Sequence, residues 1–506
     1  MLRESIQIFH TDEVAVNIHV FRDGGELKDA VLLMFRFEGK GWDKADQDRA
    51  RRVGLDPEIS FSGKAGRTRL CSAAGGTCLL VGLGKADDLD LEGFRAAVGT
   101  AVRAAASQEI ASLAVASDHL DRLELADDLT LECVVAARLA SYRFVAFKSD
   151  PGEEDCPASL AVWSGEADME AKVARALAVA DGAALARDLV NTPANVATPE
   201  YLAGVARDLA EKFGFGVQVY GPEEIVGMGM GSFASVFRGS DTPARFIVLD
   251  SMPGSDAKPL VFVGKGVTFD TGGISLKPSA KMHEMKGDMA GAAAILGLFK
   301  TLGQAGGGGR RVVGLLPCTE NVPGSRATKP GDVVTAMNGK TIEILNTDAE
   351  GRLILADALA YSERFEPEIL VDLATLTGAC LVALGTKVAA VFSTTAELDQ
   401  RIRESGSRVG ERFWPMPLWK EYGVPLKGEV ADLKNIATRE GGAIYAAMFL
   451  KNFVPEGVDW AHLDIAGPAW TDENASIFRP GGTGFGVRTL WELVDAYAGQ
   501  EGETAF

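Results

Sequence analysis

The chain has 506 residues, more than a single hydrophobic core usually holds, so we expect two or more domains. Its composition, 47% apolar and 24% charged, is that of a globular protein and excludes a disordered or fibrous chain. The formal charge of -19 repels phosphate backbones, which argues against nucleic-acid binding and mildly favours cationic substrates.

The N-terminus and the cysteines bear on the cellular compartment. Residues Met1 to Ser5 lead directly into a strand-like run and lack the apolar core and small-residue cleavage site of a signal peptide. No apolar run approaches the roughly 18 residues that cross a bilayer. The six cysteines are scattered without a CxxC pair, which favours free thiols over a disulfide or a metal site. We therefore expect a cytoplasmic protein with no membrane partner.

Short apolar runs alternate with helical patterns in the first third of the chain. This alternation predicts a smaller α/β domain with a mainly parallel sheet over residues 1–166. The predicted strands are Glu13 to Phe21, Ala30 to Phe37, Thr77 to Gly82, Ser112 to Ser117 and Ser159 to Ser164, and the predicted helices lie near Phe94 to Ser107 and Leu129 to Tyr142.

An alanine-rich stretch over residues 167–190 predicts one long helix that connects two domains and ends before Asn191-Thr192-Pro193. A second α/β domain is predicted over residues 191–506. Its expected strands are Gly216 to Tyr220, Arg245 to Asp250, Leu260 to Gly264, Arg311 to Pro317, Glu368 to Leu376 and Trp460 to Ala466, with a hairpin of Val333 to Met337 and Lys340 to Leu345, and its expected helices are Met289 to Leu302, Leu353 to Phe365, Gly442 to Phe453 and Val487 to Ala498. Asn338-Gly339 predicts a two-residue type I′ turn, and a frayed tail is expected from Gln500.

Several charged residues follow buried strands of this second domain. Lys265 and Asp270 lie at the carboxyl end of a strand, where open α/β sheets bind ligands. Asp288 precedes a helix, so it could be the N-cap or could bind a cation. His283-Glu284 does not begin an HExxH motif, because Gly287 stands where the second histidine is needed.

The segment Asn346 to Arg352 joins the predicted hairpin to the next helix. If it is extended, Asp348, Glu350 and Arg352 point to one side, and a divalent metal could offset the repulsion between the two acids. Alternatively, the two acids only lie at the N-terminus of a helix, where the helix dipole favours negative charge. Together with Asp270 and Asp288, these two acids make four carboxylates, whose charge two divalent ions would balance. Proteins often use two such metal ions to hydrolyse amides and phosphate esters.

Four blocks of this domain resemble the signature blocks of the leucyl aminopeptidase family, the cytosolic dimetal aminopeptidases. The blocks are Val263 to Pro278, Met285 to Ala290, Asn346 to Arg352 and Trp460 to Gly467. The resemblance is strong from Asn191 to Ala498, whereas the first third agrees only in size and α/β character. The expected fold is a smaller N-terminal α/β domain and a larger catalytic domain with a central mixed sheet flanked by helices.

The resemblance implies a ligand set for two divalent ions per subunit, zinc or manganese, with magnesium or cobalt also possible. Lys265, Asp270, Asp288 and Glu350 would hold one ion. Asp270, Asp348 and Glu350 would hold the other, so Asp270 and Glu350 would bridge. A lysine ligand must be neutral, which requires the metal to depress the pKa of Lys265.

The implied reaction is removal of the N-terminal residue, preferably leucine or a similar apolar residue, from peptides with a free N-terminus. A metal-bridging water would attack, Lys277 would stabilise the oxyanion, and Arg352 would hold a bicarbonate ion as the base. The implied substrate-binding residues are Met285, Asn346, Thr375, Leu376, Gly378 and Ala466.

The resemblance also implies a homohexamer. Because family members can be structural or DNA-binding proteins, a non-catalytic role of the same fold is the alternative, which the complete ligand set and the charge of -19 disfavour. A dimetal phosphoesterase is a third hypothesis, which the lack of ligand histidines disfavours.

Overall fold

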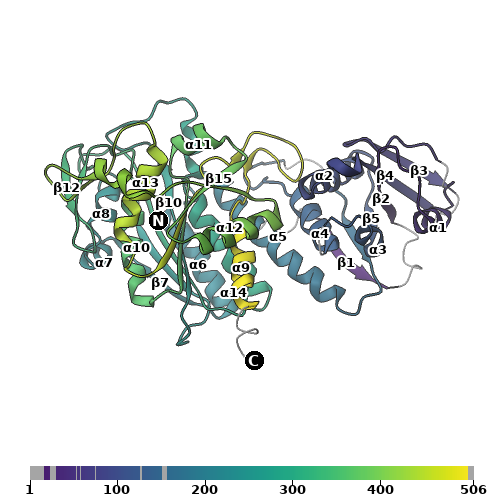
Figure 1. Ribbon diagram of the computed structural model, residues 1–506, viewed down its shortest axis with the longest axis horizontal. Coiled ribbons are helices and arrows are strands. Elements are labelled where there is room, and N and C mark those ends of the chain that lie inside the picture. The colour runs from purple at the N-terminus through teal and green to yellow at the C-terminus, as the bar shows by residue number, and fades with distance from the viewer. Residues whose placement is uncertain are drawn as a thin grey trace. The chain divides into compact units, whose positions relative to one another are not determined.

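The computed structural model describes residues 16–22, 30–52, 54–56, 59–73, 76–125, 128–150 and 156–499 (Figure 1). The chain forms two compact units. Of the described residues, the larger contains 182–471 and 481–499, and the smaller contains those between 16 and 181 together with 472–480.

The smaller unit is built on a six-stranded sheet with the order β1-β6-β5-β2-β4-β3. Only the pairing of β3 with β4 is antiparallel, so the expected mainly parallel sheet is confirmed. Its elements are β1 Asn17–Phe21, β2 Val31–Phe37, α1 Lys44–Arg52, β3 Thr68–Ala73, β4 Gly76–Gly84, α2 Leu91–Ser107, β5 Ser112–Ala116, α3 Ser117–Asp121, α4 Leu129–Ala140 and β6 Ser159–Trp163. Helix α1 and strand β3 were not predicted, and residues 13–15 of the first predicted strand lie outside the described residues.

The predicted alanine-rich helix is confirmed as α5, Met169–Asn191. It packs closely in the larger unit at Gly182, where a Cβ atom would collide with the carbonyl oxygen of Gly297 and with Oγ1 of Thr301. A connecting role for residues 167–190 between domains ending at 166 and beginning at 191 stays a prediction.

The larger unit contains a nine-stranded mixed sheet with the order β16-β15-β18-β14-β9-β11-β8-β7, in which β10 also pairs with β11. Its strands are β7 Gly216–Tyr220, β8 Arg245–Asp250, β9 Leu260–Gly264, β10 Gly266–Asp270, β11 Val312–Asn321, β14 Ile369–Ala374, β15 Val388–Ser393, β16 Arg412–Pro415 and β18 Asp459–Asp464. The central strands β18, β14, β9 and β11 are parallel, so their carboxyl ends meet at one edge.

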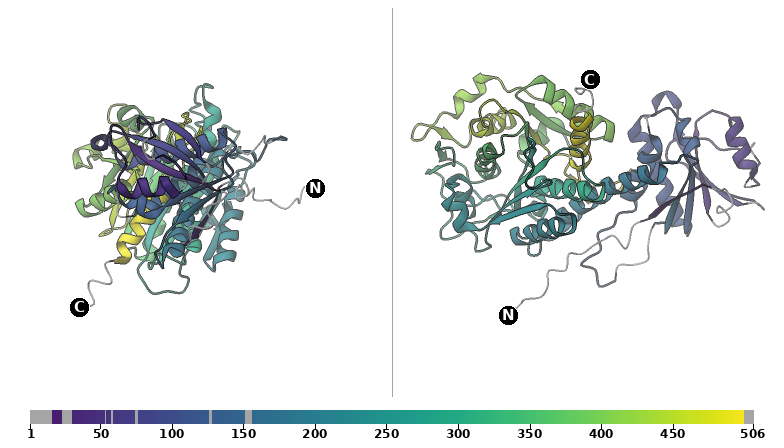
Figure 2. Two further views of the ribbon diagram at one scale, coloured as in Figure 1. Left: turned by 90° about the vertical axis from the view of Figure 1, so that its right-hand side faces the viewer. Right: turned by 90° about the horizontal axis from the view of Figure 1, so that it is seen from below.

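Helices cover both faces of this sheet, as expected (Figure 2). One face carries α6 Pro199–Phe213, α9 Ala290–Gln304, α12 Ala396–Val409 and α14 Val487–Ala498, and the other carries α8 Gly231–Phe237, α10 Gly351–Tyr361 and α13 Gly442–Leu450. The shorter elements are α7 Pro222–Gly227, α11 Gly378–Leu384, the 3-10 helix η4 Met282–Gly287, and strands β12 Asp332–Thr335, β13 Thr341–Ile344, β17 Leu433–Lys434, β19 Trp470–Thr471 and β20 Gly481–Gly482.

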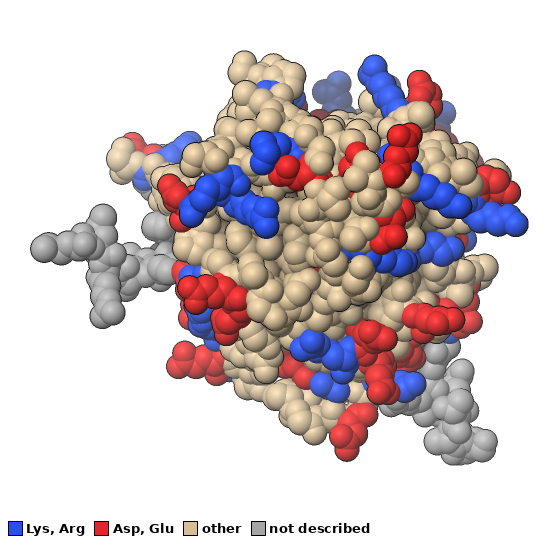
Figure 3. Space-filling view, turned by 90° about the vertical axis from the view of Figure 1, so that its left-hand side faces the viewer, with Lys and Arg blue, Asp and Glu red and all other residues tan. Residues whose placement is uncertain are grey.

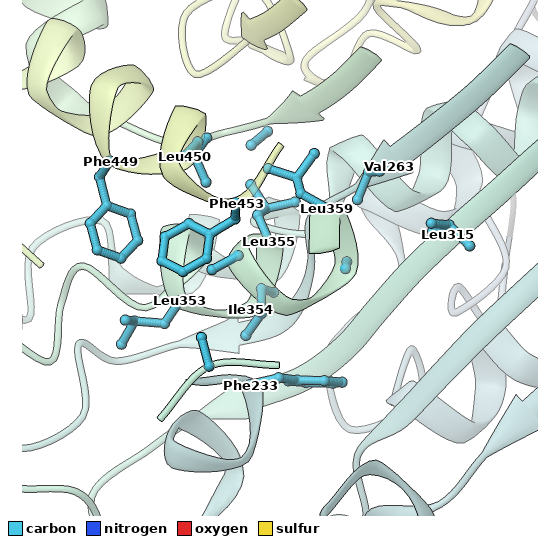
Figure 4. Packing of buried hydrophobic residues seen from close by; sticks show 14 of the residues in the cluster. Phe233, Val263, Leu315, Leu353, Ile354, Leu355, Leu359, Phe449, Leu450 and Phe453 are labelled. Atoms are coloured by element: carbon cyan, nitrogen blue, oxygen red, sulfur yellow. The ribbon is translucent and has the colours of Figure 1, made fainter. Parts of the chain in front are cut away.

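Helix α10 is held in the middle of an extensive apolar cluster (Figure 4). Leu355 and Leu359 are buried on it, between Val263 of the sheet and Phe449 of α13. Burying an aliphatic side chain of this size stabilises the fold by roughly 1.5–3 kcal/mol. Several such contacts along one helix fix the position of its N-terminus, which carries Glu350.

The hairpin of β12 and β13 differs from the prediction. The amide of Gly339 donates to the carbonyl of Ala336, and Asn338 does not adopt positive φ, which a type I′ turn requires. The turn therefore has three residues, with Gly339 at φ 85° in the left-handed region. Tertiary contacts set this conformation, because the amide of Met337 donates to Asp357 Oδ1 at 2.7 Å.

The six cysteines are free and buried, which agrees with the prediction of thiols. Within the described ranges, each helix is too short or too polar to traverse a lipid bilayer. The tail predicted to fray from Gln500 lies outside the described residues.

Candidate metal centre

Lys265 lies at the centre of a group of buried carboxylates in the larger unit. It follows β9 directly, and its Nζ is 2.6 Å from Asp288 Oδ2 and 2.9 Å from Glu350 Oε1. The same Nζ donates to the carbonyl oxygen of Thr375 at 2.9 Å. Lys265 is only 3% exposed and Glu350 only 2% exposed, so these charges interact with little solvent screening.

A glycine at the start of α10 makes this approach possible. A Cβ atom at Gly351 would lie 2.6 Å from Cε and 2.9 Å from Nζ of Lys265. A larger residue here would push the lysine away from Glu350. Gly351 therefore belongs to the site although it has no functional side chain.

A second lysine links the remaining two acids. Lys277 Nζ is 2.7 Å from Asp270 Oδ2 and also contacts Asp348 Oδ1. The loop that carries Lys277 turns through Gly272 and Gly273, whose φ angles of 88° and 66° lie in the left-handed region. Asp348 is the most exposed of the four acids, with 33% of its side chain accessible.

Burial and mutual repulsion perturb the pKa values of these groups. Burial raises the pKa of Asp288, and Asp270 and Glu350 raise it further against the opposing effect of Lys265. Burial also raises the pKa of Glu350 and of Asp348. Burial alone would lower the pKa of Lys265 and of Lys277, but the surrounding carboxylates outweigh it and hold both pKa values above their usual range.

These observations test whether the residues fit divalent ions. Oxygen atoms of Asp270, Asp288 and Glu350 lie within 4.8 Å of one another. Lys265 and Lys277 compensate only two of the four carboxylates, and buried negative charge that lacks compensation is costly. Among the described residues, none donates a hydrogen bond to Oδ2 of Asp288, although Lys265 lies close to it. Hard oxygen donors with excess negative charge are the chemistry that a divalent cation requires, so the residues fit.

The local backbone decides two questions that the sequence left open. Asn346 to Glu350 is not extended but forms a turn, in which Asn346 Oδ1 accepts from the amide of Asp348 at 2.9 Å. Glu350 occupies the N-cap of α10 without a capping hydrogen bond, because its side chain contacts Lys265 instead. Asp288, by contrast, is not the N-cap of α9, because Met289 holds that position.

Arg352 is buried in the first turn of α10. Its Nη1 donates to the carbonyl oxygen of Asn435 at 2.7 Å, and its Nε has no hydrogen-bond partner in the part of the chain that the structure describes. Burial lowers the pKa of Arg352 to about 10, so the guanidinium remains charged at neutral pH. A charged group with an unused donor can bind an anion.

The predicted substrate-binding residues come from four segments of the larger unit. Thr375 Oγ1 donates to Asp288 Oδ1 at 2.7 Å, which places this residue directly at the acid cluster. The amides of Leu376 and Ala466 both donate to Asp464 Oδ1 at 3.2 Å. The remaining three are Met285 in η4, Asn346 in the turn before α10, and Gly378 at the first position of α11, where a Cβ atom would meet open space.

Three residues at the site were not predicted from the sequence. Asn321 donates to Asp270, Thr347 Oγ1 donates to the carbonyl of Gly272 at 2.7 Å, and Asp464 accepts from two segments that carry predicted substrate-binding residues. The run Thr319-Glu320-Asn321, which ends a buried strand in polar residues, was the available signal for Asn321. The predicted strand ended too early, at Pro317, to reveal it.

Comparisons with known proteins agree with this geometry. The sequence model of the cytosol aminopeptidase family, catalytic domain, matches residues 184–491, and that of the N-terminal domain of the same family matches residues 56–151. A probable cytosol aminopeptidase of Nitratidesulfovibrio vulgaris is 54% identical over 427 residues, which cover 82% of this chain and 84% of the relative.

Two solved structures are similar over nearly the whole chain. A variant of tomato leucine aminopeptidase superimposes with a TM-score of 0.85 at 33% identity, covering 96% of this chain and 98% of the other. The bottromycin maturation enzyme BotP, solved in complex with Mn, gives a TM-score of 0.81 at 37% identity, covering 93% and 100%. The fold, the acid cluster and both family matches lead to one conclusion: this chain is a metal-dependent aminopeptidase and belongs to the cytosol aminopeptidase family.

Proposed function

We propose that the acid cluster holds two divalent ions, manganese or zinc, and that the enzyme removes leucine-like residues from the N-termini of peptides. Lys265, Asp270, Asp288 and Glu350 would hold one ion, and Asp270, Asp348 and Glu350 the other. The observation that carries the proposal is the convergence of four carboxylates around only two lysines in a largely buried site. Bound ions would supply Lewis acidity that polarises the scissile carbonyl and lowers the pKa of water.

The side chains of Lys277 and Arg352 would act on the substrate and on a base. The side chain of Lys277 is 22% exposed, so its ammonium group can donate a hydrogen bond to the oxyanion that would form at the scissile carbonyl. Arg352 would hold bicarbonate through the planar geometry of its guanidinium, and bicarbonate would accept the proton of the attacking water. The unpartnered Nε of Arg352 supports this role.

Substrate selection would follow from the bound ions and from the lining of the site. The free α-amine of a peptide would bind at one of the two ions, which would restrict cleavage to the first residue. Met285, Thr375, Gly378 and Ala466 would line the pocket for the first side chain, and Asn346 and the backbone of Leu376 would orient the substrate. These lining residues are apolar or small, which suits leucine.

A direct assay tests this function. Purified protein with Mn or Zn is expected to release the chromophore from a leucyl anilide, and a chelator is expected to stop the reaction. Asp348→Ala is expected to abolish activity, whereas the exposed control Asp432→Ala is expected to retain it. Full activity after chelation, or in Asp348→Ala, would refute the proposal.

We also propose a cytoplasmic homohexamer whose partners are peptides and not nucleic acids. On the face drawn in Figure 3, acidic and basic side chains are intermixed and form no continuous basic stripe of the kind that tracks a nucleic-acid backbone. The net charge of -19 also argues against nucleic acids as partners. Light scattering at neutral pH is expected to report six subunits, and a monomer would contradict the assembly.

A further inference from the structure

Asn321 directs its side-chain amide at the two carboxylates that the proposed function assigns to both ions. It ends β11, lies opposite Asp270 in the pairing of β10 with β11, and is only 4% exposed. Its Nδ2 donates to Asp270 Oδ1 at 2.8 Å and to the carbonyl oxygen of Thr347 at 3.0 Å, and lies 3.5 Å from Glu350 Oε2.

The identity of these partners fixes the orientation of the amide. All three are oxygen acceptors, so the opposite orientation would place the carbonyl oxygen of Asn321 against them and would be repulsive. The amide therefore presents its two N–H groups toward the carboxylates. Glu350 Oε2 at 3.5 Å receives the weakest of the three contacts.

Asn321 also decides which oxygen of Asp270 can face a cation. Oδ1 of Asp270 accepts from Asn321 Nδ2 and from the amide of Gly272, each at 2.8 Å. Oδ2 instead lies 2.7 Å from the ammonium of Lys277. Two N–H donors thus occupy one oxygen and turn the other toward positive charge.

Strand pairing does not require this side chain. The backbone carbonyl of Asn321 accepts from the amide of Thr271 and from its hydroxyl, both at 2.9 Å, so the backbone already joins the ends of β10 and β11. A purely structural side chain at this buried position could be apolar. The side-chain amide instead serves acceptors beyond the strand pair, which are the carboxylates of Asp270 and Glu350 and the carbonyl oxygen of Thr347.

We propose that Asn321 is a positioning residue, which orients Asp270 and Glu350 for the binding of divalent ions. The inference rests on the proposed function, because those two carboxylates are its assigned bridging ligands. Groups that hold metal ligands in place typically contribute a factor of about 10 to 100 in affinity. Asn321 is not a ligand itself, since its donors face the ligands.

The test measures Mn²⁺ binding to metal-free protein by the electron paramagnetic resonance signal of free Mn²⁺. Asn321→Leu keeps the volume but removes the donors, and we expect its Mn²⁺ affinity to fall about 10- to 100-fold. The matched control is Thr328→Val, which removes the 2.6 Å hydrogen bond to Ser235 in the cavity that Asn321 also lines. We expect the control to bind Mn²⁺ like the wild type.

A second variant keeps the test decisive if Asn321→Leu does not fold. Asn321→Asp has the same shape but adds negative charge, so attraction of the cation alone would tighten Mn²⁺ binding, whereas loss of orientation weakens it. We expect weaker binding, with a thermal unfolding midpoint near that of Thr328→Val.

The outcomes separate this inference from the proposed function. Wild-type protein that binds fewer than two Mn²⁺ ions would refute the proposed function and this inference with it. Wild-type protein that binds two ions, together with unchanged or tighter binding in the Asn321 variants, would overturn only the role of Asn321. A loss in Thr328→Val equal to that in Asn321→Leu would also overturn it.

Discussion

Thr377 Oγ1 donates a 2.7 Å hydrogen bond to Asp464 Oδ2. The other oxygen, Oδ1, accepts from the amides of Leu376 and Ala466, so one buried carboxylate fastens both backbone segments of the proposed substrate pocket. We predict that Asp464→Asn raises KM for a leucyl anilide about 10-fold, because one replaced acceptor costs roughly 1–2 kcal/mol. Steady-state kinetics measures this effect.

The control for that prediction is Asp432→Asn. Asp432 also accepts from a threonine hydroxyl and amide, those of Thr341 at 2.8 Å each, but it is exposed. Its KM is expected to match the wild type. An unchanged KM in Asp464→Asn, or an equal rise in both variants, would show that Asp464 does not organise the pocket.

Gly351 gives a prediction in which helix propensity and function oppose each other. Alanine favours a helix by up to about 1 kcal/mol relative to glycine, yet at this position its Cβ would lie 2.6 Å from Lys265 Cε. We predict that Gly351→Ala lowers kcat by at least about 10-fold, because displacement of catalytic groups by even 1 Å is costly. Kinetics and metal analysis of the purified variant measure the loss.

Gly204 in α6 is the matched control, because among the described residues no atom beyond the adjoining backbone of its own helix lies within 4 Å of a Cβ placed there. Gly204→Ala is expected to keep full activity and to raise the free energy of unfolding by about 0.5–1 kcal/mol. Full activity in Gly351→Ala would mean that the helix terminus has room to adapt.

Asp357 predicts a dependence of stability on pH. Its two oxygens accept from the amides of Phe233 and Met337 at 2.8 and 2.7 Å, but burial outweighs these bonds and raises its pKa to about 7. The folded protein therefore retains a proton that the unfolded chain, with a pKa of roughly 4, releases. This stabilisation is present at acidic pH and is lost as the pH rises from about 4 to about 7.

Comparison with Asp357→Asn isolates that effect, because asparagine does not titrate. The unfolding free energy of the wild type minus that of the variant is expected to fall by up to about 4 kcal/mol between pH 4 and pH 8. Denaturant unfolding at several pH values measures it. A difference that is flat, or that rises with pH, would contradict an elevated pKa for Asp357.

The sequence predicted those parts of the fold and site that depend on local pattern. The buried strand β9 and the charged residues that follow it were predictable, because apolar runs that end in polar residues mark the ligand-binding edge of an α/β sheet. Lys265 and Asp270 could therefore be singled out before their neighbours were known. The alanine-rich helix α5 was also predictable, because the helix propensity of alanine depends on the local sequence alone.

Features that depend on tertiary contacts were missed. Asp464 acquires its role from a partner that is distant in the chain, Leu376, so no local pattern marked it. Asn321 was missed because the predicted strand ended at Pro317, before the polar residues that end β11 and that lie near Asp270. The turn at Asn338-Gly339 adopted three residues because Asp357 holds Met337. Asn346 to Glu350 turned rather than extended, because the side chain of Asn346 bonds to the amide of Asp348.

The central claim is that five residues from separate segments form one dimetal site, and anomalous diffraction from crystals grown with Mn²⁺ tests it most directly. We predict two peaks at the manganese edge in each subunit, one among Lys265, Asp270, Asp288 and Glu350 and the other among Asp270, Asp348 and Glu350. The account would be contradicted if both peaks were absent, or if they marked ions that only other residues bind.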